Sequence, residues 1–160
     1  MTGNPNVITA LQAALPLEAF LNLQYRHDWR ELKAMGLGKL AGYVHDFGSD
    51  AHRWMKKVTD RLLFFDADAE YGIPSIKQST TVTAMFENQL ALEMAIIAPY
   101  EQNVQICMNA LDDTTRNLFE HLLKWHQTGK KKQVGHVLWL EQQLRLIKSF
   151  GESEYLSEKM

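Results

Sequence analysis

The chain has 160 residues, of which 46% are hydrophobic and 22% charged, and its formal net charge is −2. This size and composition predict one soluble domain, residues 1–160, with a full hydrophobic core. The small negative charge argues against a nucleic-acid or anionic-membrane partner. One cysteine excludes an internal disulfide framework, and the start lacks the basic and apolar regions of a secretory signal, so we expect a cytoplasmic protein.

The first half of the chain predicts a pair of long helices followed by a long connection. The helices span about 7–35 and 38–67, and the short turn at Gly36 should make them antiparallel neighbours. Residues 68–79, which include glycine and proline, are numerous enough to cross a bundle from end to end.

The second half predicts two further long helices and a short one. A third helix spans about 80–110, and a fourth runs with an interruption from about 112 to 150. Gly151 ends it, and residues 152–159 form a short extra helix. No convincing alternation of apolar and polar residues supports a strand, so the predicted fold class is all-α.

Three ligand-type side chains interrupt apolar helix faces. Glu18 lies in the stripe Leu11, Leu15, Glu18, Tyr25, Trp29 and Leu32. Glu93 and His136 lie in similar stripes of the third and fourth helices. Because burying an unpaired carboxylate is very costly, three such groups facing one core indicate a metal site or the remains of one.

Several short sequence strings are informative through their order and near-constant spacing: Val7-Ile8, Gln24-Tyr25, Gly36-Leu37, Arg61-Leu62-Leu63-Phe64, Leu90-Ala91-Leu92-Glu93, Gly135-His136 and Trp139-Leu140-Glu141. Together they resemble the bacterioferritin branch of the ferritin-like family. The resemblance implies a ferritin-like antiparallel four-helix bundle with a long crossover between the second and third helices. It also implies a hollow iron-storing cage of many copies, a di-iron ferroxidase centre in each bundle, and haem between paired subunits.

The di-iron ligand set of the family is incomplete in this chain. Such a site takes one glutamate from each of two helices and a Glu-x-x-His pair from each of the other two. Glu18 and Glu93 match the two single glutamates. The helix-two pair corresponds to Ala51 and Trp54, which offer no ligand, so the resemblance implies a divergent member with a degenerate ferroxidase centre and leaves enzymatic activity doubtful.

The fourth helix departs from the family pattern in ligands and in length. Its Glu-x-x-His positions read Gln133 and His136, so an amide replaces the bridging glutamate. The seven residues from His126 to Lys132 resemble an insertion. A second alignment puts His126 at the lost glutamate and the insertion after Gly129, and the sequence leaves both placements open.

Glu18, Glu93 and His136 have two interpretations. In one, they hydrogen-bond one another and Tyr25 as a remnant network, with one carboxyl protonated by burial. In the other, they hold one divalent ion weakly. A working two-iron oxidase is disfavoured, because Trp54 would occupy the space that one metal needs.

His52 stands at the haem-ligand position of the family, where bacterioferritins carry methionine. It faces about 100° away from Ala51 and so towards a paired subunit. Two copies would give bis-histidine haem ligation with a lowered reduction potential, although the same histidine also fits a haem-free interface. The resemblance places further residues around the haem: Asn22, Leu23 and Arg26 along the pocket, and Arg53 and Lys56 near the propionates.

The sequence therefore predicts an iron-storage cage subunit without a complete ferroxidase centre, with haem at His52 for electron transfer in iron release. Such a subunit would work best in a mixed cage beside a catalytically complete partner. Two alternatives remain. One is a ferroxidase with an unconventional site that recruits Asp50, Gln133 or His126, and the other is a cofactor-free structural or assembly subunit.

Overall fold

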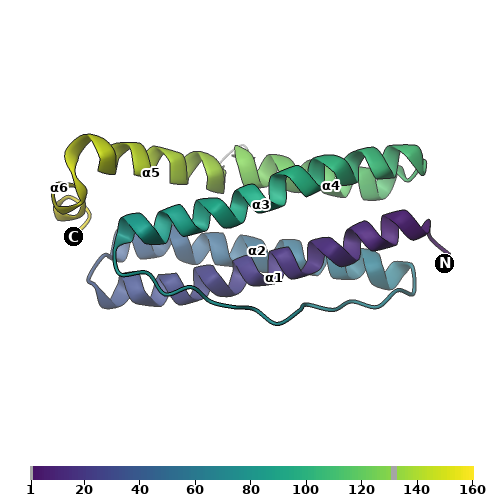
Figure 1. Cartoon of the computed structure of the whole chain (residues 1–160), viewed down its shortest axis with the longest axis horizontal. Coiled ribbons are helices and arrows are strands. Elements are labelled where there is room, and N and C mark those ends of the chain that lie inside the picture. Colours follow the sequence, from purple (N-terminus) through teal and green to yellow (C-terminus); the bar gives the residue numbers. More distant parts are fainter. Residues whose placement is uncertain (1, 131–132) are drawn as a thin grey trace.

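A computed structural model describes residues 2–130 and 133–160, with the backbone alone at Lys130 and Gln133. Helices α1 (Pro5–Ala34) and α2 (Gly38–Phe64) lie side by side and antiparallel. The chain then returns along the whole length of the bundle before α3 (Val82–Asn109) begins (Figure 1). The predicted ferritin-like arrangement with a long crossover is confirmed.

The predicted fourth helix consists of two shorter helices in line with each other, α4 (Asp113–Gln127) and α5 (His136–Phe150) (Figure 1). A small antiparallel hairpin separates them, formed by β1 (Gly129–Lys130) and β2 (Gln133–Val134). The short helix α6 (Glu152–Ser157) ends the fold. The chain is all-α apart from this hairpin, which the sequence did not predict. Lys131 and Lys132 of the expected insertion lie outside the described residues.

Two glycines shape the junction between α4 and α5. Gly129 has a φ of +86°, a conformation that residues with a Cβ rarely adopt. A Cβ on Gly135 would come within 2.4 Å of the Gln127 carbonyl oxygen, so only glycine fits where the chain returns over the end of α4. The hairpin therefore begins after Thr128 and leaves His126 in α4, as in the second of the two predicted alignments.

The core lies between the helix pairs, and α2 contributes one continuous apolar stripe to it. All members of that stripe are buried: Leu40, Val44, Phe47, Ala51, Trp54, Val58, Leu62 and Phe65. Trp29, expected in the core, is only half-buried, and its ring packs against His45 with centroids 4.7 Å apart. Among the described residues, none of the helices combines the length and apolarity that a membrane span requires.

Candidate functional site

Five ionisable side chains from all the long helices meet in the middle of the bundle. Glu18 comes from α1, Asp50 from α2, Glu93 from α3, His126 from the end of α4 and His136 from the start of α5. We call these five residues the core cluster. The two glutamates and two histidines are at most 1% exposed, and Asp50 is 8% exposed. The split between α4 and α5 is what brings two histidines from one side of the bundle into the same centre.

The two imidazoles bridge the three carboxylates in a continuous chain. His126 lies between Glu93 (Nδ1 to Oε2, 2.6 Å) and Glu18 (Nε2 to Oε1, 2.7 Å). His136 lies between Glu93 (Nδ1 to Oε1, 2.6 Å) and Asp50 (Nε2 to Oδ2, 3.0 Å). Since a carboxylate only accepts, both nitrogens of each ring donate, and both rings are imidazolium cations.

The charge pattern keeps the buried groups ionised. Burial alone would raise the pKa of Glu93, but the two imidazolium cations outweigh it and lower that pKa to about 2. Burial alone would lower the pKa of His126, but Glu18 and Glu93 raise it to about 10. The pKa of His136 is raised against burial as well, chiefly by Glu93. The expectation that burial protonates one carboxyl is therefore wrong for Glu93, because the histidines supply the compensating charge.

Further polar groups complete the cluster at its edges. The Tyr25 hydroxyl donates to Glu93 Oε1 at 2.5 Å, as the network interpretation predicted, and burial raises the pKa of Tyr25 so that it stays a donor. Arg53, whose side chain is 50% exposed, donates to Asp50 and connects the cluster to the surface of α2. Three carboxylates, two imidazolium cations and one guanidinium balance to zero net charge.

Aromatic rings enclose the cluster on its α2 side. The Trp54 ring lies 4.2 Å from the His126 ring and 4.9 Å from the His136 ring, centroid to centroid. Phe47 stacks on His136 with centroids 4.1 Å apart. Ala51, fully buried, adds no donor atom. The two positions where the family resemblance places helix-two ligands thus carry apolar side chains, and one of them, Trp54, packs on both histidines.

His52, the predicted haem ligand, is exposed on α2 and outside the core cluster. Within the described part of the chain, its imidazole makes no hydrogen bond or ion pair, so its ring nitrogens are open to an external partner. Two cations are expected near the haem propionates. Arg53 donates a hydrogen bond to Asp50, and Lys56 Nζ lies 3.8 Å from Asp60 Oδ2.

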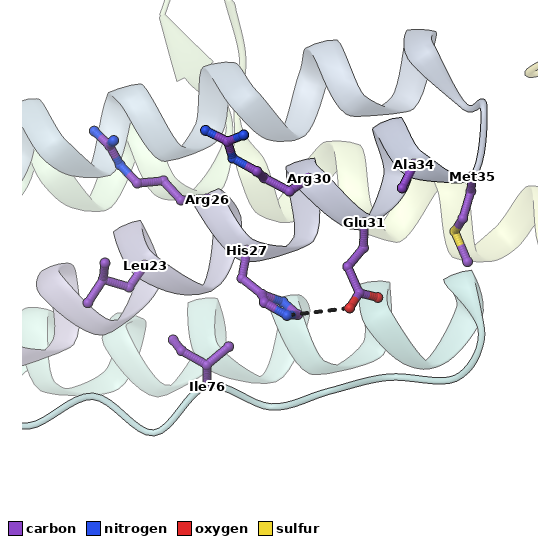
Figure 2. A pocket seen from close by; sticks show the side chains of 8 residues that line it. All are labelled: Leu23, Arg26, His27, Arg30, Glu31, Ala34, Met35 and Ile76. Carbon is purple, nitrogen blue, oxygen red and sulfur yellow. Dashed lines mark ion pairs between the residues drawn. The ribbon is translucent and has the colours of Figure 1, made fainter.

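The predicted haem-lining residues of α1 lie at or beside a surface pocket of about 750 Å³. Leu23 and Arg26 line it together with Ile76 of the crossover segment (Figure 2). Asn22 is buried and accepts a hydrogen bond from Arg26 Nε at 2.9 Å. His52 does not line this pocket, so the structure brings together the α1 residues of the predicted haem site but not its ligand.

Comparison with known proteins assigns the family. A model of the ferritin-like domain matches residues 8–150. A bacterioferritin of Streptomyces coelicolor is 30% identical over 158 residues, which covers 98% of this chain and 90% of that protein. The chain belongs to the bacterioferritins of the ferritin-like family. A bacterioferritin of Brucella melitensis is 29% identical over 97% of this chain and 92% of its own length. The solved Mycobacterium tuberculosis bacterioferritin BfrA superposes with a TM-score of 0.92 at 25% identity, over 100% of this chain and 97% of that one.

For a bacterioferritin, the bundle centre of this chain has an unusual composition. Sequence reasoning placed Glu18, Glu93 and His136 there, and all three are in the core cluster. One of the two open alignments also placed His126 there, whereas Asp50 was named only as a possible recruit. Gln133, the third named recruit, has no described side chain. The charge count favours that alignment of His126, since buried carboxylates need cations and the chain offers few inward ones.

Proposed function

We propose that this bacterioferritin is an iron-storage cage subunit that does not oxidise iron at its own bundle centre. One observation carries the proposal: the two α2 positions where the resemblance places a Glu-x-x-His pair hold Ala51 and Trp54, and the Trp54 ring packs on both His126 and His136.

Two-iron chemistry needs more donors than this centre provides. A di-iron site of this architecture uses about four carboxylates and two neutral imidazoles, so that both ions are bridged and one face stays open to oxygen. Here Ala51 and Trp54 replace the helix-two ligands, and the Trp54 ring packs on both histidines. The alternative of a ferroxidase that recruits Asp50 and His126 requires both rings to release their protons and Trp54 to move.

A subunit of this kind works best in a mixed cage. The catalytically complete partner would oxidise iron, and this subunit would contribute wall and storage volume in the cytoplasm. Co-expression with a complete bacterioferritin subunit that carries an affinity tag tests the arrangement. We expect both chains in one assembly after size exclusion. Two separate assemblies would overturn the mixed cage and favour a structural subunit that assembles by itself.

We also propose that haem binds at His52, between two paired subunits. The observation that favours it is the exposed imidazole, which has no intrachain partner in the described part of the chain. Haem, when bound, would supply one-electron transfer for iron release, and His52 would provide one of two symmetric axial imidazoles. Its unpaired ring suits that role.

Absorption spectra test the haem proposal directly. Protein from haem-replete cells should show a Soret band and sharp low-spin reduced bands, near one haem per two subunits, as two symmetric ligands require. His52→Ala should abolish these bands, whereas His121→Ala, at an exposed histidine of α4, should keep them. A featureless spectrum of the unaltered protein would remove haem from the account.

A further inference from the structure

We propose that Arg26, Arg30 and Lys33 bind a short chain of phosphate groups along the exposed side of α1. We call these three residues the basic ridge. The inference does not depend on the proposed function, because phosphate binding involves neither iron nor haem. Arg30 and Lys33 are also not among the residues that the resemblance assigns to haem.

The basic ridge is a continuous line of exposed cations. Its members are separated by four and by three residues, so their side chains lie on one face of α1. Together they span about 10 Å of the helix axis. Like charges at these spacings repel one another. An anion that reaches all three residues would relieve this repulsion, and the line is too long for a single carboxylate.

No carboxylate in the described part of the chain neutralises the basic ridge. None of its three side chains forms an ion pair there. Three other arginines of the helices do: Arg53 with Asp50, Arg61 with Asp112, and Arg116 with Asp113. The ridge thus leaves three positive charges without a partner in a chain whose formal net charge is −2.

The acidic residues nearest to the ridge in sequence contact histidines instead. Glu31 Oε1 lies 3.4 Å from His27 Nε2, and Asp46 Oδ1 of α2 lies 3.4 Å from His45 Nδ1. Figure 2 shows both arginine side chains of the ridge extending to the same side of α1, away from the pair of His27 and Glu31. The guanidinium groups are therefore free to face an anion from solvent.

The two guanidinium groups are held in place by neutral neighbours. Arg26 Nε donates to Asn22 Oδ1 at 2.9 Å, which leaves its terminal nitrogens free. Arg30 lies over the Trp29 ring, with its Cζ 4.9 Å from the centroid, and Lys33 Nζ lies 5.8 Å from the same centroid. A guanidinium fork matches two oxygens of a phosphate, and an ammonium binds phosphate as a point charge.

Surface pockets on both sides of the ridge provide room for such a ligand. Arg26 and Arg30 line the pocket of about 750 Å³ (Figure 2). Lys33 lines a second pocket of about 570 Å³ together with Lys39, which adds a fourth cation from the first turn of α2. A chain of phosphates carries at least one negative charge per group and can extend from one pocket to the other, which a single phosphate cannot.

Titration calorimetry of the assembled protein with tripolyphosphate tests the proposal at about 0.15 M salt. Arg26→Gln and Arg30→Gln should each weaken binding about tenfold, because each removes charged hydrogen bonds. The matched control Arg145→Gln, at an exposed arginine of α5, should bind as the unaltered protein does. Orthophosphate should bind more weakly, since it cannot reach all three cations. Equal affinity for adenosine triphosphate would show that the phosphates alone are recognised, and tighter binding would identify a nucleotide as their source.

Trp29 supplies a second readout, because two cations of the ridge lie over its ring. Tripolyphosphate should change the tryptophan fluorescence, and Trp29→Phe should abolish most of this change while calorimetric binding persists. Absence of binding at about 0.15 M salt would overturn the inference. Equal affinity of the unaltered protein and both arginine variants, or equal affinity for orthophosphate and tripolyphosphate, would also overturn it.

Discussion

Replacing His126 by alanine is the sharpest perturbation of the core cluster. The variant removes a fully buried imidazolium and leaves Glu18 and Glu93 facing each other without the cation between them. Removing one partner of a buried ion pair costs about 3–5 kcal/mol, because the remaining charges stay desolvated. The two charge-assisted hydrogen bonds lost, at roughly 1.5–3 kcal/mol each, lead to the same range.

Denaturant unfolding with a chelator present, at one subunit concentration, measures this loss. We expect a decrease of about 3–5 kcal/mol in the free energy of unfolding for His126→Ala. The exposed control His121→Ala should stay within about 0.5 kcal/mol. A loss below about 1 kcal/mol for His126→Ala would refute the view that this imidazolium compensates two buried carboxylates.

The pH dependence of the same measurement has a defined sign. The folded pKa of His126 is about 10 against 6.5, so its contribution is complete below about pH 6.5 and declines as pH rises towards 10. The folded pKa of Glu93 is about 2 against 4.5, so its contribution is complete above about pH 4.5 and declines as pH falls towards 2. Between these limits the cluster is most stabilising. His126→Ala should flatten the alkaline decline, and an unchanged alkaline decline would contradict the assignment.

Three other substitutions test how the fold positions the site. Gly135→Ala places a Cβ within 2.4 Å of the Gln127 carbonyl oxygen and should destabilise the protein by several kcal/mol through local backbone strain. Gly42→Ala, in open space on α2, should instead stabilise it by up to about 1 kcal/mol. Thermal unfolding measures both. Equal effects would contradict the close junction of α4 and α5. Gln24→Ala removes two hydrogen bonds to the Lys77 backbone and one to the buried Asp28 carboxylate. It should speed proteolysis of the crossover segment and also cost about 1–3 kcal/mol of global stability, because a buried acceptor loses a donor. An unchanged cleavage rate would show that other contacts hold the segment. Glu152→Ala removes the acceptor of two hydrogen bonds from Thr83, in the first turn of α3. It should lower the free energy of unfolding in chemical denaturation by about 0.5–2 kcal/mol. An unchanged free energy of unfolding would show that this contact of α6 with α3 does not stabilise the fold.

The helices and the crossover were predictable because their signals are local. Helical spacing of apolar residues identified the α1 stripe around Glu18. Gly36 and Gly151, both with positive φ, mark helix ends that the sequence predicted. Glu18, Glu93 and His136 were found at the core because a charged residue in an apolar stripe is conspicuous. These signals need no knowledge of what lies across the bundle.

The hydrogen bonds of His126 and His136 to the three carboxylates were not predictable, because they depend on the residue at which α4 ends. A two-strand hairpin between α4 and α5 decides whether His126 faces the core, and nothing in local periodicity fixes where the helix breaks. Asp50 was overlooked as a core residue for a different reason. It precedes Ala51 on α2 at the edge of the apolar stripe, and only the position of His136 opposite makes it part of the cluster. Tertiary contacts thus determine the chemistry of this centre.

Stopped-flow oxidation of Fe²⁺ by the purified, iron-free protein tests the central claim most directly. With oxygen present and iron added in steps, a complete di-iron centre gives a fast phase that saturates near two Fe²⁺ per subunit. We predict no such phase and only slow oxidation that grows with total iron. A fast phase saturating near two Fe²⁺ per subunit would contradict the account and establish a ferroxidase built from this unusual set of residues.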